Sequence, residues 1–488
     1  MRPPVWRRGA AGSIMAPMTQ TSRIERRSID VVPVSERHGS PVNQLTLWFG
    51  ANMQITAVVD GALAVVFGAD ALWAIIGTLV GNLLGGVVMA LHSAQGPRLG
   101  LPQMISSRAQ FGVIGAVVPL VLVVLMYLGF ASTGTVLAGQ AVSRALGLDT
   151  PTVGIVVFGV LSAVVAIVGY RWIHALGRVG TVVGIIAWSY LAVRLFTAYD
   201  IPALLGRKPF ELATFLLAVS LGAGWQLTYG PYVADYSRYL PIGTPERRTF
   251  WATLAGSVIG SQWSMTLGAL IASLPAATGK GFLANQVGAV GELAGGGAIA
   301  IVFYLVIVVG KLTVNCLNAY GGSMTMLTTM SAFRRAARVS TLARALYISG
   351  FIAVSVLVAL LASADFLANF KNFVLLLLMV FTPWSAINLV DYYLVSRERV
   401  DIPALYDPAG RYGSVNAMAL GVYLFGIVVQ VPFLAQTLYT GPATEALGGA
   451  DISWIVGLLV TAAIYYPLAR AQRRAPERTV YPEGVLDA

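Results

Sequence analysis

A series of apolar runs, each as long as a membrane-spanning helix, limits the fold of this sequence more than any other feature. A helix that crosses a bilayer needs about 20 mostly apolar residues, and the chain contains about twelve such runs, separated by short polar loops. Only 11% of its 488 residues are charged, whereas soluble domains carry about 25%. The sequence therefore predicts an all-α polytopic membrane protein without a soluble domain. The predicted spans are about 43–67, 71–92, 112–144, 152–169, 177–198, 212–236, 250–274, 296–328, 342–362, 369–395, 415–437 and 452–470.

Two of the predicted spans contain residues that interrupt a helix. The first reads GANMQITAVVDGAL at its centre, and the sixth reads GAGWQLTYGPYVADYSRY. Backbone unwinds at membrane depth only where it is buried in protein or lines a cavity, and secondary transporters place broken helices around a substrate site near the bilayer midplane. The broken spans are five helices apart, which favours two inverted five-helix repeats, about 43–198 and 212–395, and two extra helices at about 415–470.

Positive charge is concentrated on one side of the predicted membrane protein. If the N-terminus is cytoplasmic, about 25 of the 32 Lys and Arg residues lie in the terminal segments and the even-numbered loops. Because cytoplasmic loops carry the excess of basic residues, both termini are predicted to be cytoplasmic, in a multi-pass protein of the cytoplasmic membrane. The same asymmetry accounts for the net charge of +11 without a nucleic-acid partner.

The termini are polar enough to be separated from the transporter domain. We expect a disordered cytoplasmic tail over residues 1–40, a single transmembrane domain over 41–470 and a second tail over 471–488. No hydrophobic core follows the N-terminal arginine pairs closely enough to form a signal peptide. A start at Met15 or Met18 is an alternative to the printed start.

Ionisable side chains inside predicted spans are costly unless they are paired or hydrated, so each one marks a candidate site. Asp60 follows the interruption of the first span, where it either caps the restarted helix or binds a cation or proton. Asp235 and Asp391 lie at predicted cytoplasmic ends beside Arg238 and Arg397. We interpret these as interfacial caps or ion pairs, and Asp235 with Arg238 as a candidate inner gate.

The eighth span carries polar residues at helical spacing. Lys311, Asn315 and Asn318 lie at i, i+4 and i+7 and share one stripe of the helix, whereas Thr313 points to a different face. An asparagine offers both donors and an acceptor, which suits the edge of an amide-like heterocycle. Asparagine also joins helices to one another in lipid. The lysine on the same stripe favours the interpretation that these residues line a binding site over the interpretation that they join helices.

Aromatic residues supply a complementary surface. Tyr127 and Phe130 lie about one turn apart in the third span, and Trp225 and Gln226 lie among glycines in the sixth. A planar ring can stack on such side chains while Gln226 reads its edge. Packing between helices is the alternative role for each aromatic residue taken alone.

The order and spacing of several segments resemble those of the nucleobase:cation symporter family, in its purine-cytosine permease branch. The resemblance covers about residues 30–470. The segments are SPVNQLTLWFGANMQITAVVDGAL, GNLLGG, GLPQMISSRAQFG, GWQLTYGPYVADYSRYLP and VNCLNAYGGSMT.

The resemblance implies a LeuT-type fold with helices 1 and 6 broken, and a nucleobase bound between aromatic residues of the third and sixth spans. Phe130 and Trp225 take the stacking roles at the matching positions. Asn315 and Asn318 take the polar roles of the eighth span, and Gln54 that of the first.

Two positions depart from the family pattern. Tyr127 stands where some relatives have Gln, which changes the hydrogen-bond set and leaves the identity of the nucleobase open. Sodium-coupled relatives have two adjacent hydroxyls where this chain has Thr313 and Val314. Sodium requires about five or six oxygen ligands and is repelled by an ammonium group, whereas a lysine amine can bind and release a proton. We therefore favour proton coupling with Lys311 as the carrier and Asp60 as the second candidate.

The predicted function is secondary active uptake of a nucleobase, cytosine or a purine, by cation symport with alternating access. In this mechanism spans 1, 2, 6 and 7 rock against spans 3, 4, 8 and 9. A symporter for another small amide-bearing solute, such as a hydantoin, allantoin or an amino acid, is the alternative, with sodium as a possible coupling ion.

An enzyme is not expected, because the sequence contains no HExxH, GxSxG, phosphate-loop or CxxC motif. The single cysteine, Cys316, excludes disulfides and thiolate metal sites. We expect no cofactor beyond the coupling ion, H⁺ or Na⁺, and no partner beyond the small solute and the lipid bilayer. Family resemblance implies function as a monomer.

Overall fold

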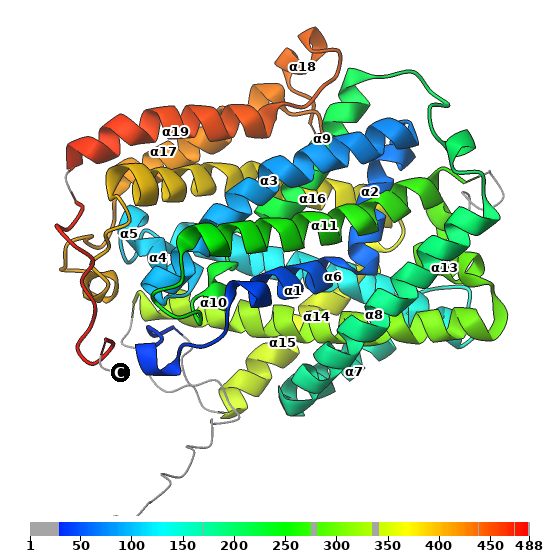
Figure 1. The fold of residues 1–488 in the computed structure, drawn as a ribbon, viewed down its shortest axis with the longest axis horizontal. Helices are drawn as coiled ribbons and strands as arrows, with labels where there is room; N and C mark the ends of the chain where they lie inside the picture. Colours follow the sequence, from blue (N-terminus) through cyan, green and yellow to red (C-terminus); the bar gives the residue numbers. More distant parts are fainter. Residues whose placement is uncertain are drawn as a thin grey trace, which may run out of the picture.

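The structure is a computed structural model that describes residues 29–168, 170–274, 281–333, 341–437, 439–472 and 474–486. Helix makes up 74% of it. The described residues form no β-strand and only two isolated β-bridges. The prediction of an all-α protein is confirmed (Figure 1).

The helices occur where the apolar runs predict them. Among the described residues, six helices are long and apolar enough to cross a membrane, or seven if the bent pair α1 and α2 is one span. The longer helices are α1 (Pro41–Asn52), α2 (Ile55–Val66), α3 (Ala71–Leu99), α6 (Val117–Ala145), α7 (Thr152–Val168), α8 (Tyr170–Ala198), α9 (Leu212–Leu227), α11 (Glu246–Ala272), α13 (Gln286–Ala294), α14 (Gly297–Ser331), α15 (Thr341–Ala362), α16 (Phe366–Leu389), α17 (Ala417–Val428) and α19 (Ser453–Gln472). The short segments are η1 (Val34–Glu36), α4 (Gln103–Ser106), α5 (Arg108–Phe111), η2 (Pro202–Leu204), α10 (Ala234–Ser237), η3 (Val390–Val395), η4 (Pro403–Tyr406), η5 (Val431–Phe433) and α18 (Pro442–Ala446).

Both predicted interruptions are present. Helices α1 and α2 meet at an angle of 61°, and Met53 and Gln54 between them are not helical. Helix α9 ends at Leu227, and a series of turns leads to the short helix α10. The backbone groups freed at these breaks lie inside the protein, because Asn52 and Leu227 are fully buried.

The helices pack in two groups. In the first, α3 packs on α9 and α11, and α11 packs on α1 and α2. In the second, α6 packs on α7, α14 and α15. Helices α17 and α19 lie on one edge of the molecule, and α7 and α15 lie on the opposite edge (Figure 1). The broken span α1–α2 and helix α14 belong to different groups.

Glycines allow the helices of the first group to approach at backbone distance. A Cβ atom at Gly268 of α11 would lie 2.8 Å from the carbonyl carbon of Val58 and 3.0 Å from the nitrogen of Ala62. Gly61 of α2 faces the backbone of Met265 in the same way. Small residues at such crossings let packing and dispersion forces hold helices together in lipid.

The variant G268A is expected to unfold at a lower temperature than the wild type, because the added methyl group forces α2 and α11 apart at a cost of about 1–3 kcal/mol. The matched control is G421A in α17, where a Cβ atom would meet nothing within 4 Å. Thermal unfolding of the detergent-solubilised proteins measures the difference. Equal melting temperatures for the two variants would contradict the close packing.

Part of the N-terminal segment, which the sequence predicts to be a disordered tail over residues 1–40, is ordered. Residues 1–28 lie outside the described residues, but Val31 and Val32 are buried. The Val32 amide donates to the Gly100 carbonyl at 2.9 Å, and the Val34 amide donates to the Val485 carbonyl at 3.0 Å. Residues 29–40 are therefore ordered, because their few apolar side chains join a buried cluster with the C-terminal segment.

Candidate functional site

Asn52 joins the two broken spans. Its Oδ1 atom accepts hydrogen bonds from the indole nitrogen of Trp225 at 2.6 Å and from the hydroxyl of Tyr229 at 3.0 Å. Its Nδ2 atom donates to the Trp48 carbonyl at 2.7 Å and to Ser257 Oγ at 3.2 Å. All of its polar capacity is used inside the protein, so Asn52 sets the position of Trp225 beside the first break.

Lys311 of α14 reaches the same break from the second group of helices. Its side chain is buried, and Nζ donates to Gln54 Oε1 at 2.6 Å and to the hydroxyl of Thr56. A buried ammonium group needs such acceptors to offset its lost hydration. The Thr313 hydroxyl donates to the Val309 carbonyl of its own helix at 3.1 Å. Thr313 therefore does not share these contacts, as its predicted position on another face indicates.

The aromatic residues of the third and sixth spans lie close together. The Phe130 ring lies 6.1 Å from the Trp225 ring at an interplanar angle of 90°, and 5.2 Å from the Phe373 ring. Tyr127 lies 5.3 Å from Tyr232. Because Phe130 and Trp225 are perpendicular, they form a corner in this conformation and not a parallel slot. A planar solute can stack on one ring and meet the edge of the other.

Gln226 lies on a different side of α9 from Trp225. Its Nε2 atom donates to Asn82 Oδ1 and to Ser261 Oγ, both at 3.0 Å, and its Oε1 atom accepts from Ser257 Oγ at 2.6 Å. These contacts join α9 to α3 and α11 and leave none of its hydrogen-bonding groups free. The structure brings Trp225 to Phe130 and does not bring Gln226 there.

Two amide atoms of α14 remain without partners. Asn315 Nδ2 donates to the Ala131 carbonyl at 3.2 Å and to Thr135 Oγ1 at 2.9 Å, which joins α14 to α6. Asn315 Oδ1 and Asn318 Nδ2 are buried and make no hydrogen bond to the described residues. The unsatisfied acceptor and the unsatisfied donor lie on adjacent turns of α14. A solute that carries an N–H group next to a carbonyl would form a hydrogen bond with each of them.

Asp60 lies inside α2 and does not cap it. The N-cap residue of α2 is Gln54, and Asp60 lies in the middle of the helix with no exposed surface. The helix-cap alternative is therefore wrong. Both carboxyl oxygens lack a hydrogen-bond partner among the described residues.

Asp235 and Arg238 lie together at α10. The Asp235 carboxylate accepts from the Gln103 amide at 2.7 Å, and Arg238 Nε donates to the Asp235 carbonyl at 3.2 Å. Asp391 of η3 accepts from Gln110 Nε2 at 2.9 Å and from the Tyr465 hydroxyl at 3.2 Å. Asp391 therefore contacts neutral side chains of other elements and, among the described residues, forms no ion pair with Arg397, which lies beside it in the sequence.

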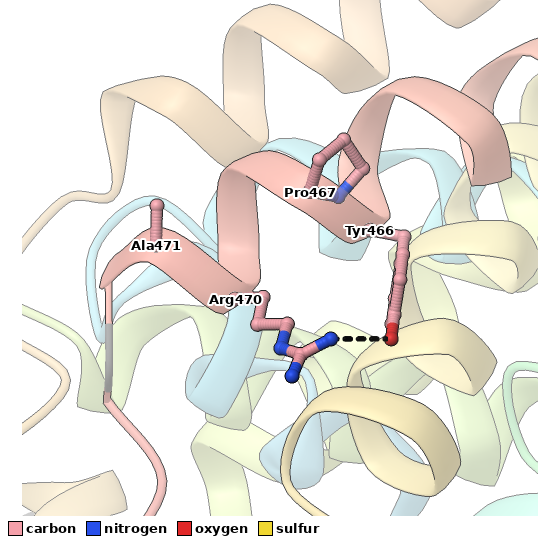
Figure 2. Close-up of a pocket in the computed structure, with 4 residues that line it drawn as sticks. All are labelled: Tyr466, Pro467, Arg470 and Ala471. Carbon is pink, nitrogen blue, oxygen red and sulfur yellow. Dashed lines mark hydrogen bonds between the residues drawn. The ribbon is translucent and has the colours of Figure 1, made fainter.

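A depression on the surface of α19 is not a candidate for the solute site. Tyr466, Pro467, Arg470 and Ala471 line it, and Arg470 Nη1 donates to the Tyr466 hydroxyl at 3.3 Å (Figure 2). All four residues come from one outer helix, far in sequence from both breaks. The part of the chain that the structure describes holds no cluster of three His, Cys, Asp or Glu residues suited to a metal ion.

Asn52 and Thr56 contact the candidate residues but were not singled out from the sequence. Both belong to the stretch that interrupts the first span, which is the signal that points to them. The register of an unwound segment cannot be read from helical periodicity, so the sequence could not show which of its polar side chains point inward.

The sequence is similar to those of known permeases. A model of the family described as permease for cytosine/purines, uracil, thiamine, allantoin matches residues 31–457. YxlA of Bacillus subtilis, which carries the name of a purine-cytosine permease, is 38% identical over 469 residues, which are 94% of this chain and 99% of that protein. The purine-cytosine permease fcyB of Emericella nidulans is 26% identical over 91% of this chain and 87% of its own.

The fold is that of a solved transporter. The inward-facing conformation of Mhp1 matches with a TM-score of 0.77 at 19% identity, over 95% of this chain and 98% of the other. Mhp1 in a closed conformation with bromovinylhydantoin bound, described as a nucleobase-cation-symport-1 family transporter, matches with a TM-score of 0.71 at 20% identity over the same shares. The fold is therefore LeuT-like. The chain belongs to the family of permeases for cytosine/purines, uracil, thiamine and allantoin, and is a multi-pass membrane transporter of small molecules, not an enzyme.

Proposed function

We propose that this permease takes up a nucleobase, cytosine or a purine, together with a cation. The observation that carries the proposal is the pair of unsatisfied amide atoms, Asn315 Oδ1 and Asn318 Nδ2, on α14. We propose that a solute with the adjacent N–H and carbonyl of a lactam edge satisfies this acceptor and this donor. Relatives named as purine-cytosine permeases support this solute class.

The aromatic corner supports a planar solute. Phe130 is half-buried while Trp225 is held by Asn52, so one ring is fixed and the other retains an accessible surface. We propose that Phe130 and Trp225 stack the ring, that Asn315 and Asn318 read its edges, and that Tyr127 closes the site beside them. Gln54 and Gln226 are weaker candidates because hydrogen bonds within the protein already occupy their amide groups.

The alternative solute is another small amide-bearing molecule. A hydantoin offers the same lactam edge as a nucleobase, and a relative named as hydantoin permease, from Microbacterium maritypicum, is 22% identical over 89% of this chain. Allantoin shares this chemistry. An amino acid would need an acidic side chain for its ammonium group, and the cationic Lys311 at the break opposes that.

We expect the topology to be that of two inverted repeats. The proposed arrangement has twelve spans, with repeats at about 43–198 and 212–395, extra helices at about 415–470, and both termini in the cytoplasm. The paired breaks and the two packing groups support it. The groups are proposed to rock against each other about the site, with Asp235 and Arg238 bracing the inner gate of a functional monomer.

The coupling ion is proposed to be a proton. Asp60 lies in α2 just beyond the first break, and Lys311 donates to Gln54 and Thr56 at that break, so its amine uses these oxygen atoms. The hydroxyl of Thr313 is bonded within its own helix, which disfavours it as a sodium ligand. Uptake that continues without sodium and stops when a protonophore collapses the proton gradient is the expected result. Uptake that requires sodium and resists the protonophore would contradict it.

The solute class is tested by uptake of radiolabelled cytosine into cells that lack their own permease. Unlabelled purines and pyrimidines are expected to compete, and amino acids are not, because the site pairs a lactam edge with aromatic rings. Competition by hydantoins or allantoin alone would favour the alternative solute. Competition by amino acids alone would contradict the proposal.

The variant N318A is expected to raise KM for the transported base about tenfold, because one solute carbonyl loses its donor. The matched control is L317A, at an adjacent residue whose side chain is 38% exposed on the outer face of α14. Equal KM values in the two variants would remove Asn318 from the site.

A further inference from the structure

We propose that Asp60 binds the transported proton and that Lys311 is a fixed cation that ties α14 to the broken first span. The inference rests on the proposed symport, since it names which of two ionisable residues carries the coupling ion. It reverses the order expected from the sequence, where Lys311 was the first candidate.

The contacts of Asp60 require it to be neutral in this conformation. Its side chain is 0% exposed, and neither carboxyl oxygen has a hydrogen-bond partner among the described residues. A carboxylate without water or a partner is far less stable in such a place than the protonated acid. We therefore assign the protonated form to Asp60 in this conformation.

The contacts of Lys311 have the opposite character. Its amine has two oxygen acceptors, Gln54 Oε1 and Thr56 Oγ1, which stabilise an ammonium group. A charged group with acceptors can keep its proton while buried. Lys311 is therefore suited to hold two helices together, and Asp60 is suited to gain and lose a proton.

The groups around Asp60 explain why a proton fits better than a metal ion. Thr56 lies one turn earlier on the same face of α2, but its hydroxyl already contacts Lys311. Backbone carbonyls in the middle of a helix bond within the helix. Sodium would need about five or six oxygen ligands, whereas a proton needs one.

Ionisable side chains of three other segments lie against the first span around α2, which carries Asp60. Tyr229, which follows α9, donates to Asn52 at the first break, and Lys311 of α14 contacts Thr56. Lys371 of α16 lies over the Phe67 ring at the end of α2, 3.9 Å from its centroid. On the side that faces α11, Gly61, the residue after Asp60, packs against the backbone of Met265. Among the described residues, the Asp60 carboxyl group forms no ion pair with any of these ionisable side chains.

The transport cycle then moves one proton through Asp60. In a conformation that admits outside water, the carboxylate takes a proton and an O–H bond forms, which lets α2 pack as it does here. When the two helix groups separate on the inner side, water reaches the acid, the O–H bond breaks and the proton leaves. The solute and the proton cross together because α2 can pack as it does here only when the Asp60 carboxyl group is protonated.

The test uses the purified full-length protein in liposomes with radiolabelled cytosine. One assay measures accumulation driven by an alkaline interior, and the other measures exchange of labelled for unlabelled cytosine at equal pH on both sides. The variant D60N, which is neutral at every pH, is expected to lower driven accumulation at least about tenfold while exchange persists. The rise in external pH that accompanies wild-type uptake is expected to be absent.

Control variants separate the two roles. K311Q is expected to slow accumulation and exchange together, and D365N, at an exposed N-cap position of α16, is expected to retain both. If D60N does not elute as a folded protein, D60S takes its place, because serine is smaller and neutral. Driven accumulation that survives in D60N, or a K311Q variant that exchanges but does not accumulate, would overturn the inference. Absence of exchange in the wild type would instead contradict the proposed solute.

Discussion

Replacement of Trp225 by alanine is expected to lower uptake at least about 100-fold, because it removes a stacking surface and a buried side chain at once. Truncation of a buried aromatic residue costs about 3–5 kcal/mol, and about 1.4 kcal/mol corresponds to a tenfold change in binding. The indole also donates to Asn52, so its loss leaves Asn52 Oδ1 with Tyr229 as its donor. The measurement is the kinetics of radiolabelled cytosine uptake at equal amounts of protein in the membrane.

Two further variants separate stacking from hydrogen bonding. W225F keeps an aromatic ring and loses the N–H group, so it is expected to retain more uptake than W225A and to show a raised KM. W263A is the matched control, because Trp263 of α11 is 41% exposed on the outer surface. Unchanged KM in W225A, or an equal loss in W263A, would contradict the role of Trp225 as a platform.

Much of the fold follows from the sequence because the bilayer imposes strong rules. Apolar length predicts the helices, and glycine with polar residues at membrane depth predicts the breaks. The two breaks and the stripe of Lys311, Asn315 and Asn318 are found where these rules place them. A regular helix has 3.6 residues per turn, so the sequence spacing of these three residues predicts that they share one face.

The sequence is less informative where the helix is irregular. Gln226 and Trp225 are neighbours, and a rotation of about 100° between them decides which one faces Phe130. The restart of the first span could not be placed either, and this is why Asp60 was a candidate cap although Gln54 has that position. Residues 29–40 contact residues far along the chain, and no local pattern predicts such pairing.

The contact of Lys311 with the first break links the two helix groups through a single side chain. Helix α14 packs on α6, and the broken span packs on α11, so the hydrogen bond from Lys311 to Gln54 crosses the boundary between the groups. Any motion of one group against the other must break or remake it. Because the bond is buried, its loss leaves acceptors without a partner, at a cost of about 1–3 kcal/mol for each one.

The variant K311M is expected to lower uptake at least about 100-fold, since it removes both hydrogen bonds while keeping most of the side-chain volume. K311R is not expected to restore transport, because the planar guanidinium group is larger than the space that the amine fills. The matched control is K208M, where an exposed lysine donates to the Gly68 carbonyl at 2.9 Å outside the site. Uptake kinetics of the three variants, normalised to folded protein in the membrane, give the comparison. If K311M transported as well as K208M, the amine would be dispensable, and the two helix groups would have to be coupled by other contacts such as that between Phe130 and Trp225.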